Sequence, residues 1–150
     1  MPAVSDGGRH SASEDVSSVA LWRPPDGAAG TAPLPDDVRV ALDRELPYLS
    51  DSRARVVADS GARTAAALPE GPHWRLLHLA TRPTGRRQGL AAAVLAPALA
   101  RCDTDRVPAA AVAYSWAAVA YLRGAGFRVT ADLETADGAM PVWVVTREPR

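Results

Sequence analysis

A short loop rich in arginine and glycine joins an apolar run to an Ala/Leu-rich segment over residues 79–91, and this junction constrains the fold more than any other stretch. The apolar run 74–81 predicts a strand. The segment from Gln88 to about Arg101 carries Leu90, Val94, Leu95 and Leu99 at helical spacing, which predicts a helix with one core-facing side. A strand that passes through a tight turn into a helix is typical of mixed αβ folds, in which helices pack on a sheet.

The same junction has the composition of an anion site. The first backbone N–H groups of a helix lack intrahelical acceptors, and the helix dipole adds partial positive charge at that end. Gly89 and the small Ala91 leave room for a diphosphate, while Arg86 and Arg87 add forked, charged donors. Arginine and glycine also follow strands in ordinary connections, so the loop alone leaves a purely structural role open.

The remaining patterns predict alternating strands and helices on both sides of this junction. Asp36 and Asp37 can cap a helix that Pro47 ends, and Ser115 can cap another that runs to Arg123. The other expected elements are a strand over 16–22, a helix over about 51–68, a strand over 107–114, and a hairpin of strands 127–133 and 141–146 around Asp137-Gly138. This order predicts an α/β fold.

Composition narrows the classes of protein. With 150 residues we expect one domain over 16–150, preceded by a disordered polar tail over 1–15. A formal net charge of zero gives no basic surface for nucleic acid. The single cysteine, Cys102, excludes an internal disulfide and offers no metal cluster. Neither a membrane span nor a leader is visible, so we expect a soluble, cytoplasmic protein with no membrane partner.

Three segments carry a resemblance to a known family. Arg86-Arg-Gln-Gly-Leu-Ala91 fits the Gln/Arg-x-x-Gly-x-Gly/Ala motif of the GCN5-related N-acetyltransferase (GNAT) superfamily. Ala120-Tyr-Leu-Arg-Gly-Ala-Gly-Phe127 resembles the Tyr-x-x-x-Gly-Phe end of the family's next helix, and residues 137–147 resemble its closing strand. The resemblance covers about residues 16–147. It implies a mixed, mostly antiparallel sheet of about five strands flanked by helices, and acetyl-CoA as co-substrate without a metal.

The resemblance also implies roles for particular residues. Tyr121 would be the general acid that protonates the departing thiolate, and His78 is one candidate for the base, although a chain of waters could serve instead. Glu134 and Asp137 could contact the acceptor, or simply be solvated turn residues. Backbone groups of Leu79, Ala80 and Thr81 would hold the thioester end of the coenzyme, and its pyrophosphate would lie on Arg86, Arg87, Gln88, Gly89, Leu90 and Ala91. We expect the acceptor to be an amine of a small molecule or peptide.

One departure from the family pattern concerns the segment before residue 16. Relatives usually carry a strand and two helices there, and this sequence has 15 mostly polar residues. The chain would then be a late-starting fragment or a shortened member. A shortened sheet would expose an open edge and favour a homodimer. The alternative to an N-acetyltransferase is therefore a non-catalytic GNAT-like module that binds coenzyme A or dimerises without turnover.

Overall fold

The protein is described from a computed structural model that covers residues 3–4, 10–12, 16–25, 35–50 and 53–150. Its centre is a seven-stranded sheet with the order β1-β2-β3-β4-β5-β7-β6. The strands are β1 (Ala3–Val4), β2 (His10–Ala12), β3 (Ser18–Arg23), β4 (Trp74–Thr81), β5 (Ala109–Ala113), β6 (Arg128–Glu134) and β7 (Pro141–Arg147). Neighbouring strands are antiparallel except β4 and β5, which are parallel. The mixed, mostly antiparallel sheet that the sequence predicted is confirmed.

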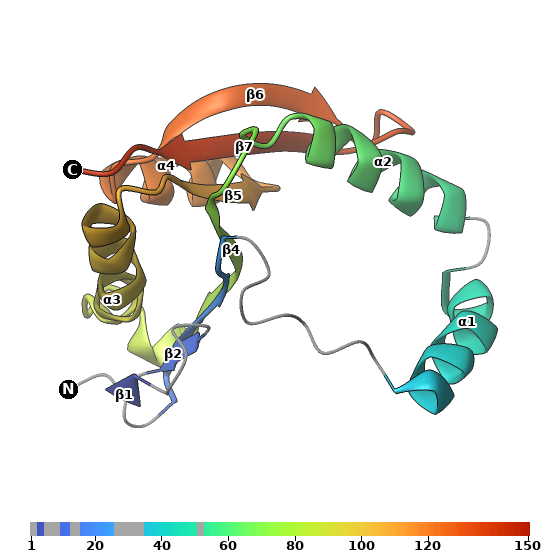
Figure 1. Cartoon of the computed structure of the whole chain (residues 1–150), viewed down its shortest axis with the longest axis horizontal. Helices are drawn as coiled ribbons and strands as arrows, with labels where there is room; N and C mark the ends of the chain where they lie inside the picture. The colour runs from blue at the N-terminus through green and yellow to red at the C-terminus, as the bar shows by residue number, and fades with distance from the viewer. Residues whose placement is uncertain (1–2, 5–9, 13–15, 26–34, 51–52) are drawn as a thin grey trace.

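Two helices pack on one face of this sheet. They are α3 (Leu90–Asp105) and α4 (Trp116–Gly124), and both lie on the same side in Figure 1. Their buried side chains join those of alternate strand residues in one apolar core, made of Ala20, Trp22, Trp74, Leu76, Val94, Leu95, Ala98, Cys102, Ala109, Ala111, Ala113, Val119, Leu122, Phe127 and Val145. Because side chains alternate along a strand, the residues between these core positions point to the opposite face. Over β3, β4 and β5 that face carries Leu21, Arg23, Arg75, Leu77, His78, Ala110 and Val112, and we name it the open face.

The other two helices connect β3 to β4. Helix α1 (Asp36–Ser50) stands apart from the sheet in Figure 1 and packs chiefly against α2 (Ala54–Ala66). The prediction that Pro47 ends α1 is wrong, since the helix continues to Ser50. A proline removes one helical hydrogen bond, and Asp43, four residues earlier, is exposed, so water can solvate the carbonyl that loses its donor. None of the described helices is both long and apolar enough to cross a membrane.

Part of the predicted tail belongs to the sheet. Strands β1 and β2 lie within residues 1–15, where the sequence predicted disorder, and the rest of that segment lies outside the described residues. Strand β2 pairs with β3, and the buried Ser11 hydroxyl donates a hydrogen bond to the Val94 carbonyl of α3. This pairing and this side-chain contact hold β2 in the sheet. With β1 and β2 the sheet has seven strands, where about five were expected.

Candidate functional site

The site is built where β4 and β5 separate. The two strands pair only from Trp74 to Leu76, opposite Ala109 to Ala111, although β4 continues to Thr81. The Arg82 N–H donates to the Ser17 carbonyl on the β3 side, at 2.8 Å. Successive N–H groups of a strand point to opposite neighbours, so those of Leu79 and Thr81 point towards β5, where β4 has no partner. The separation therefore opens a slot lined by free backbone groups.

A β-bulge marks the point of separation. Leu21 pairs with His78 and the next residue, Trp22, pairs with Leu76, so Leu77 is an extra residue without a partner on either neighbouring strand. The bulge puts Leu76 and Leu79, three residues apart, on the same core-facing side. A bulge also bends its strand, and the pairing of β4 with β5 ends at Leu76, directly before the extra residue.

The arginine-rich loop closes one end of the slot. A short 3₁₀ turn, η2 (Pro83–Gly85), leads to Gly89, which sits at the N-terminus of α3 with φ of 77°. This left-handed conformation favours glycine, and a Cβ built on Gly89 would meet no atom within 4 Å. Arg87 also has a positive φ, of 63°, which is uncommon for a residue with a side chain. Gln88 holds the loop through its Nε2, which donates to the Thr84 carbonyl at 3.0 Å.

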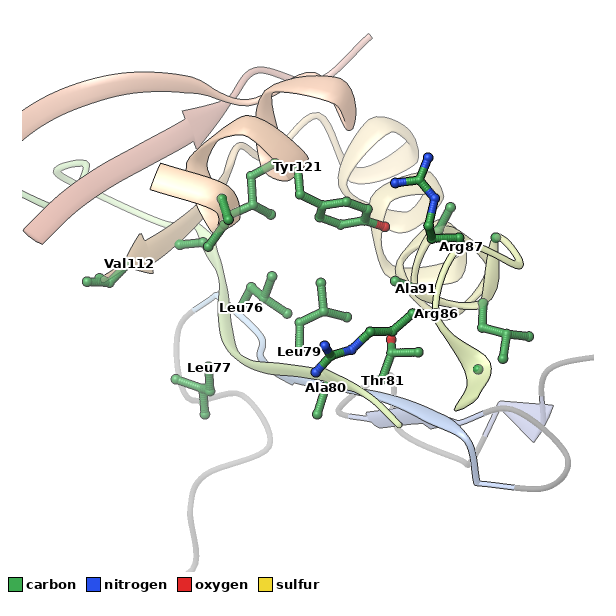
Figure 2. A pocket seen from close by; sticks show the side chains of 18 residues that line it. Leu76, Leu77, Leu79, Ala80, Thr81, Arg86, Arg87, Ala91, Val112 and Tyr121 are labelled. Atoms are coloured by element: carbon green, nitrogen blue, oxygen red, sulfur yellow. The ribbon is translucent and has the colours of Figure 1, made fainter. Parts of the chain in front are cut away.

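A cavity of about 900 Å³ joins the slot to this loop. Nine of the residues predicted from the sequence line it: Leu79, Ala80, Thr81, Arg86, Arg87, Gly89, Leu90, Ala91 and Tyr121. Figure 2 shows their side chains around the space between β4, α3 and α4. Gln88 is predicted as a ligand-binding residue but lies outside the lining, because its amide bonds the loop itself.

Helix α4 forms the remaining wall. The Ser115 side chain accepts a hydrogen bond from the Ala118 N–H at 3.2 Å, which fixes the start of the helix as the sequence predicted. About one helical turn after Ala118, the ring of Tyr121 points into the cavity (Figure 2). Partial burial raises the pKa of Tyr121 above its ordinary value, so its hydroxyl keeps its proton at neutral pH.

The other predicted polar residues are not in the cavity. His78 pairs with Leu21 at the bulge, and its exposed side chain does not line the cavity. The Asp137 carboxylate accepts hydrogen bonds from the Thr135 hydroxyl and the Ala139 N–H and pairs with Arg53, and the first of these contacts contributes most to lowering its pKa. These contacts make Asp137 part of the turn between β6 and β7. Glu134 is exposed at the end of β6.

Several lining residues escaped the sequence analysis. They are Leu76, Leu77, Gly85, Ala92, Ala111, Val112, Ala117, Ala118 and Leu122. Gly85 is buried, and a Cβ there would lie 3.1 Å from Leu90 Cδ1, so a larger residue would require the Leu90 side chain to shift. Ala117 and Ala118 lie about one turn before Tyr121. Small residues at that helical spacing could have indicated that this side of α4 lines a cavity. No comparable sequence pattern predicted the bulge at Leu77.

The fold is that of known acetyltransferases. A crystal structure titled histone acetyltransferase HPA2 and related acetyltransferase, from Corynebacterium glutamicum, matches with a TM-score of 0.59 and 21% identity. That match covers 93% of this chain and 62% of the other, so this chain spans under two thirds of that protein. Chaetomium thermophilum Naa20, solved with a bisubstrate analogue, matches with a TM-score of 0.59 and 12% identity over 96% of this chain and 67% of Naa20.

A third structure, an N-acetyltransferase from Staphylococcus aureus, matches with a TM-score of 0.53 and 12% identity over 92% of this chain and 69% of the other. No protein-family model matches the sequence. At these identities the likeness concerns the fold, which is the GNAT fold that the resemblance implied.

Proposed function

We propose that this chain, which has the GNAT fold, transfers an acetyl group from acetyl-CoA to an amine of a small molecule or peptide. The observation that carries the proposal is the convergence of three features in one cavity. These are the free strand edge at Leu79 and Thr81, the N-terminus of α3 at Gly89, and the Tyr121 ring. Each is suited to a different part of the co-substrate or of the reaction.

The residues present fit the shape and charge of coenzyme A. Its pyrophosphate would lie on the N–H groups that begin α3, beside Arg86 and Arg87, because these donors lack other acceptors and the helix dipole favours an anion. Gly89 leaves the approach open. Its pantetheine arm would run along β4 and bond the slot-facing backbone groups of Leu79 and Thr81, as an added strand would.

The reaction needs a polarised carbonyl and a proton for the leaving group. The amine nitrogen bonds the thioester carbonyl carbon, the carbon–sulfur bond breaks, and the sulfur takes a proton while the amine loses one. An N–H from Leu79 or Thr81 would donate to the carbonyl oxygen as negative charge develops there. Tyr121 would give its hydroxyl proton to the sulfur, and its raised pKa keeps that proton available at neutral pH.

The amine must lose a proton on the other side of the reaction centre. His78 lies at the bulge, on the strand that bounds the slot, and pairs with Leu21 of the open face. Because its side chain does not line the cavity, it would receive the proton through water.

A titration with acetyl-CoA by calorimetry tests the coenzyme site. Gly89→Asp adds a carboxylate where the pyrophosphate would lie, and we expect it to weaken binding by more than about tenfold. Gly89→Asn has nearly the same shape without the charge, and Asn and Asp both tolerate a positive φ, so it should bind acetyl-CoA more tightly than Gly89→Asp, and the difference measures the effect of the charge. Gly61→Asp, on the exposed surface of α2, should bind like the parent chain.

The outcomes separate the proposal from its competitor. Equal affinity in the parent chain and in Gly89→Asp would exclude the loop as the pyrophosphate site. Binding without release of free coenzyme A in the presence of amines would mean that the chain is a coenzyme-binding module and not an enzyme.

A further inference from the structure

The cavity reaches through the sheet to the open face. Leu76 and Leu79 line it from the side of α3 and α4, whereas Leu77 and Val112 line it from the other side. Figure 2 shows these two pairs on opposite sides of the β4 ribbon. A group that enters from the open face therefore meets the slot at the bulge, without passing the loop at Gly89.

Two arginines lie on the open face beside this entrance. Arg23 is directly opposite Arg75 in the antiparallel pairing of β3 and β4, and paired residues place their side chains on the same face. Arg75 comes two residues before Leu77, so both point to the open face. Like charges in directly opposite positions destabilise a sheet. Among the described residues, no carboxylate forms an ion pair with either arginine.

Arg75 is the more enclosed of the two. Burial lowers its pKa most, the charge of Arg23 lowers it further, and Tyr114 raises it. Tyr114 follows the end of β5, two residues after Val112, so this interaction links Arg75 to the strand on the far side of the slot. The guanidinium therefore belongs to the mouth of the slot, and within the part of the chain that the structure describes no carboxylate pairs with it.

The surface around the arginines is apolar except at His78, which lies opposite Leu21 on the same face. Leu21 and Leu77, on the adjacent strands β3 and β4, are each 40% exposed. Val112 continues this surface on β5. The entrance therefore offers two cations within an apolar surround.

We propose that the acceptor is an amine that also carries a carboxylate and an apolar side chain, as an apolar amino acid does, with the carboxylate held by Arg75 and Arg23. This rests on the proposed function, because it concerns the acceptor side of the same slot. Guanidinium groups bind carboxylates through paired, charge-assisted hydrogen bonds. A carboxylate there would offset the repulsion between the arginines, and the apolar side chain would cover Leu21 and Leu77.

The test measures the binding of N-acetylated amino acids, which are the products of the proposed reaction. It therefore does not require the chain to turn over. N-acetyl-leucine and N-acetyl-leucinamide differ only in the charge of the terminal group, and each is titrated by calorimetry with and without saturating coenzyme A. We expect the carboxylate to bind at least about tenfold more tightly than the amide, the effect of one charge-assisted hydrogen bond. Arg75→Gln should abolish that difference and leave the affinity for coenzyme A unchanged.

Arg101→Gln is the matched control, because Arg101 lies on α3, on the other side of the sheet, and pairs there with Asp105 at 3.0 Å. It should keep the preference for the carboxylate. Equal affinity for the two ligands, or no binding of either to a chain that binds coenzyme A, would overturn the proposal. If coenzyme A does not bind but the carboxylate preference and its loss in Arg75→Gln persist, the arginine site stands and the proposed function fails.

Discussion

The two helix pairs beside the sheet are packed in opposite ways. Helices α3 and α4 bury six side chains in the core, namely Val94, Leu95, Ala98, Cys102, Val119 and Leu122. The described side chains of α1 are all exposed, and α2 buries only Thr64. Helix α2 is attached to the hairpin by polar contacts instead, from the Ala136 N–H to the Ser60 hydroxyl and from Arg53 to Asp137.

The two sides of the slot differ in a similar way, although α1 and α2 contribute no described residue to the cavity lining. The wall proposed to hold the coenzyme is made of α3, α4 and their loop, and tight packing fixes its backbone donors in place. Within the described residues, the open face, proposed to receive the acceptor, is exposed at Leu21, Arg23 and Leu77, although Ala110 of β5 is fully buried on it. Exposure thus differs between the wall that would bind an invariant co-substrate and the face that would select an acceptor.

The comparison predicts very different costs for truncating a side chain in the two helix pairs. Leu95 is 1% exposed in α3, and Leu95→Ala should lower the free energy of unfolding by about 3 kcal/mol, through lost burial and a cavity. Val57 is 64% exposed in α2, and Val57→Ala should change it by less than about 0.5 kcal/mol. Urea unfolding measures both. A similar loss in the two variants would contradict the difference in packing.

Tyr121 tests whether the packed wall takes part in the chemistry as well as in binding. Removing the hydroxyl in Tyr121→Phe leaves the ring in the cavity, so the affinity for acetyl-CoA should stay the same. The rate of acetyl transfer should fall about 100-fold, as expected for loss of a general acid. An unchanged rate, measured by release of free coenzyme A, would limit Tyr121 to a packing role.

An ion pair joins α3 to β7, and its contribution to the free energy of unfolding should depend on pH. Both guanidinium N–H₂ groups of Arg147 donate to Asp103, at 2.8 and 2.9 Å, and Arg147 is 5% exposed. The hydrogen bonds from Arg147 are the largest cause that lowers the pKa of Asp103, to about 2. A lowered carboxyl pKa contributes stability that is complete above its unfolded value of about 3.9 and is lost as the pH falls towards 2.

Asp103→Ala should therefore lower the free energy of unfolding at pH 7 by about 2 kcal/mol. This is less than for fully buried pairs, because the Asp103 side chain is 29% exposed. Asp103→Asn should flatten the dependence on pH between 2 and 4. An unfolding free energy that keeps the parent slope in this range would show that another group is responsible.

The rate at which a thiol reagent labels Cys102 measures how often α3 opens, and it is the smallest effect that we expect. Its thiol is fully buried in α3, and burial is the largest cause that raises its pKa to about 11. At pH 8 about one thiol in a thousand would be ionised, so a thiol reagent should not label the folded chain. Labelling should become complete in urea. Rapid labelling without denaturant would mean that α3 opens locally.

Some of this molecule could be predicted from the sequence, where the signal is local. The strand 74–81 is found with its predicted bounds, the Ser115 cap is confirmed, and the loop residues from Arg86 to Ala91 line the cavity except Gln88. Each depends on apolar spacing, a capping residue or a glycine within one short segment.

The missed features depend on pairing between distant segments. Strands β1 and β2 are too short to show a period. Strand β2 is ordered by contacts with β3 and α3, and β1 pairs with β2. The bulge at Leu77 and the pair Arg23–Arg75 exist only in the register between β3 and β4, which lie more than 50 residues apart. Register is set by which faces are buried, and the sequence of β4 alone does not specify it.

Because Leu77 is the extra residue of the bulge, the sheet should tolerate its deletion from β4. Without Leu77, Leu76 and His78 would become neighbours, and every remaining pair between β3 and β4 would keep its partner. Trp74, Leu76 and Leu79 would then follow the simple alternation of a regular strand and keep facing the core. Most single-residue deletions inside a strand turn its core side chains to the wrong face. A chain shortened at Leu77 should instead fold with β4 and β5 paired further along, so this residue serves the opening and not the sheet.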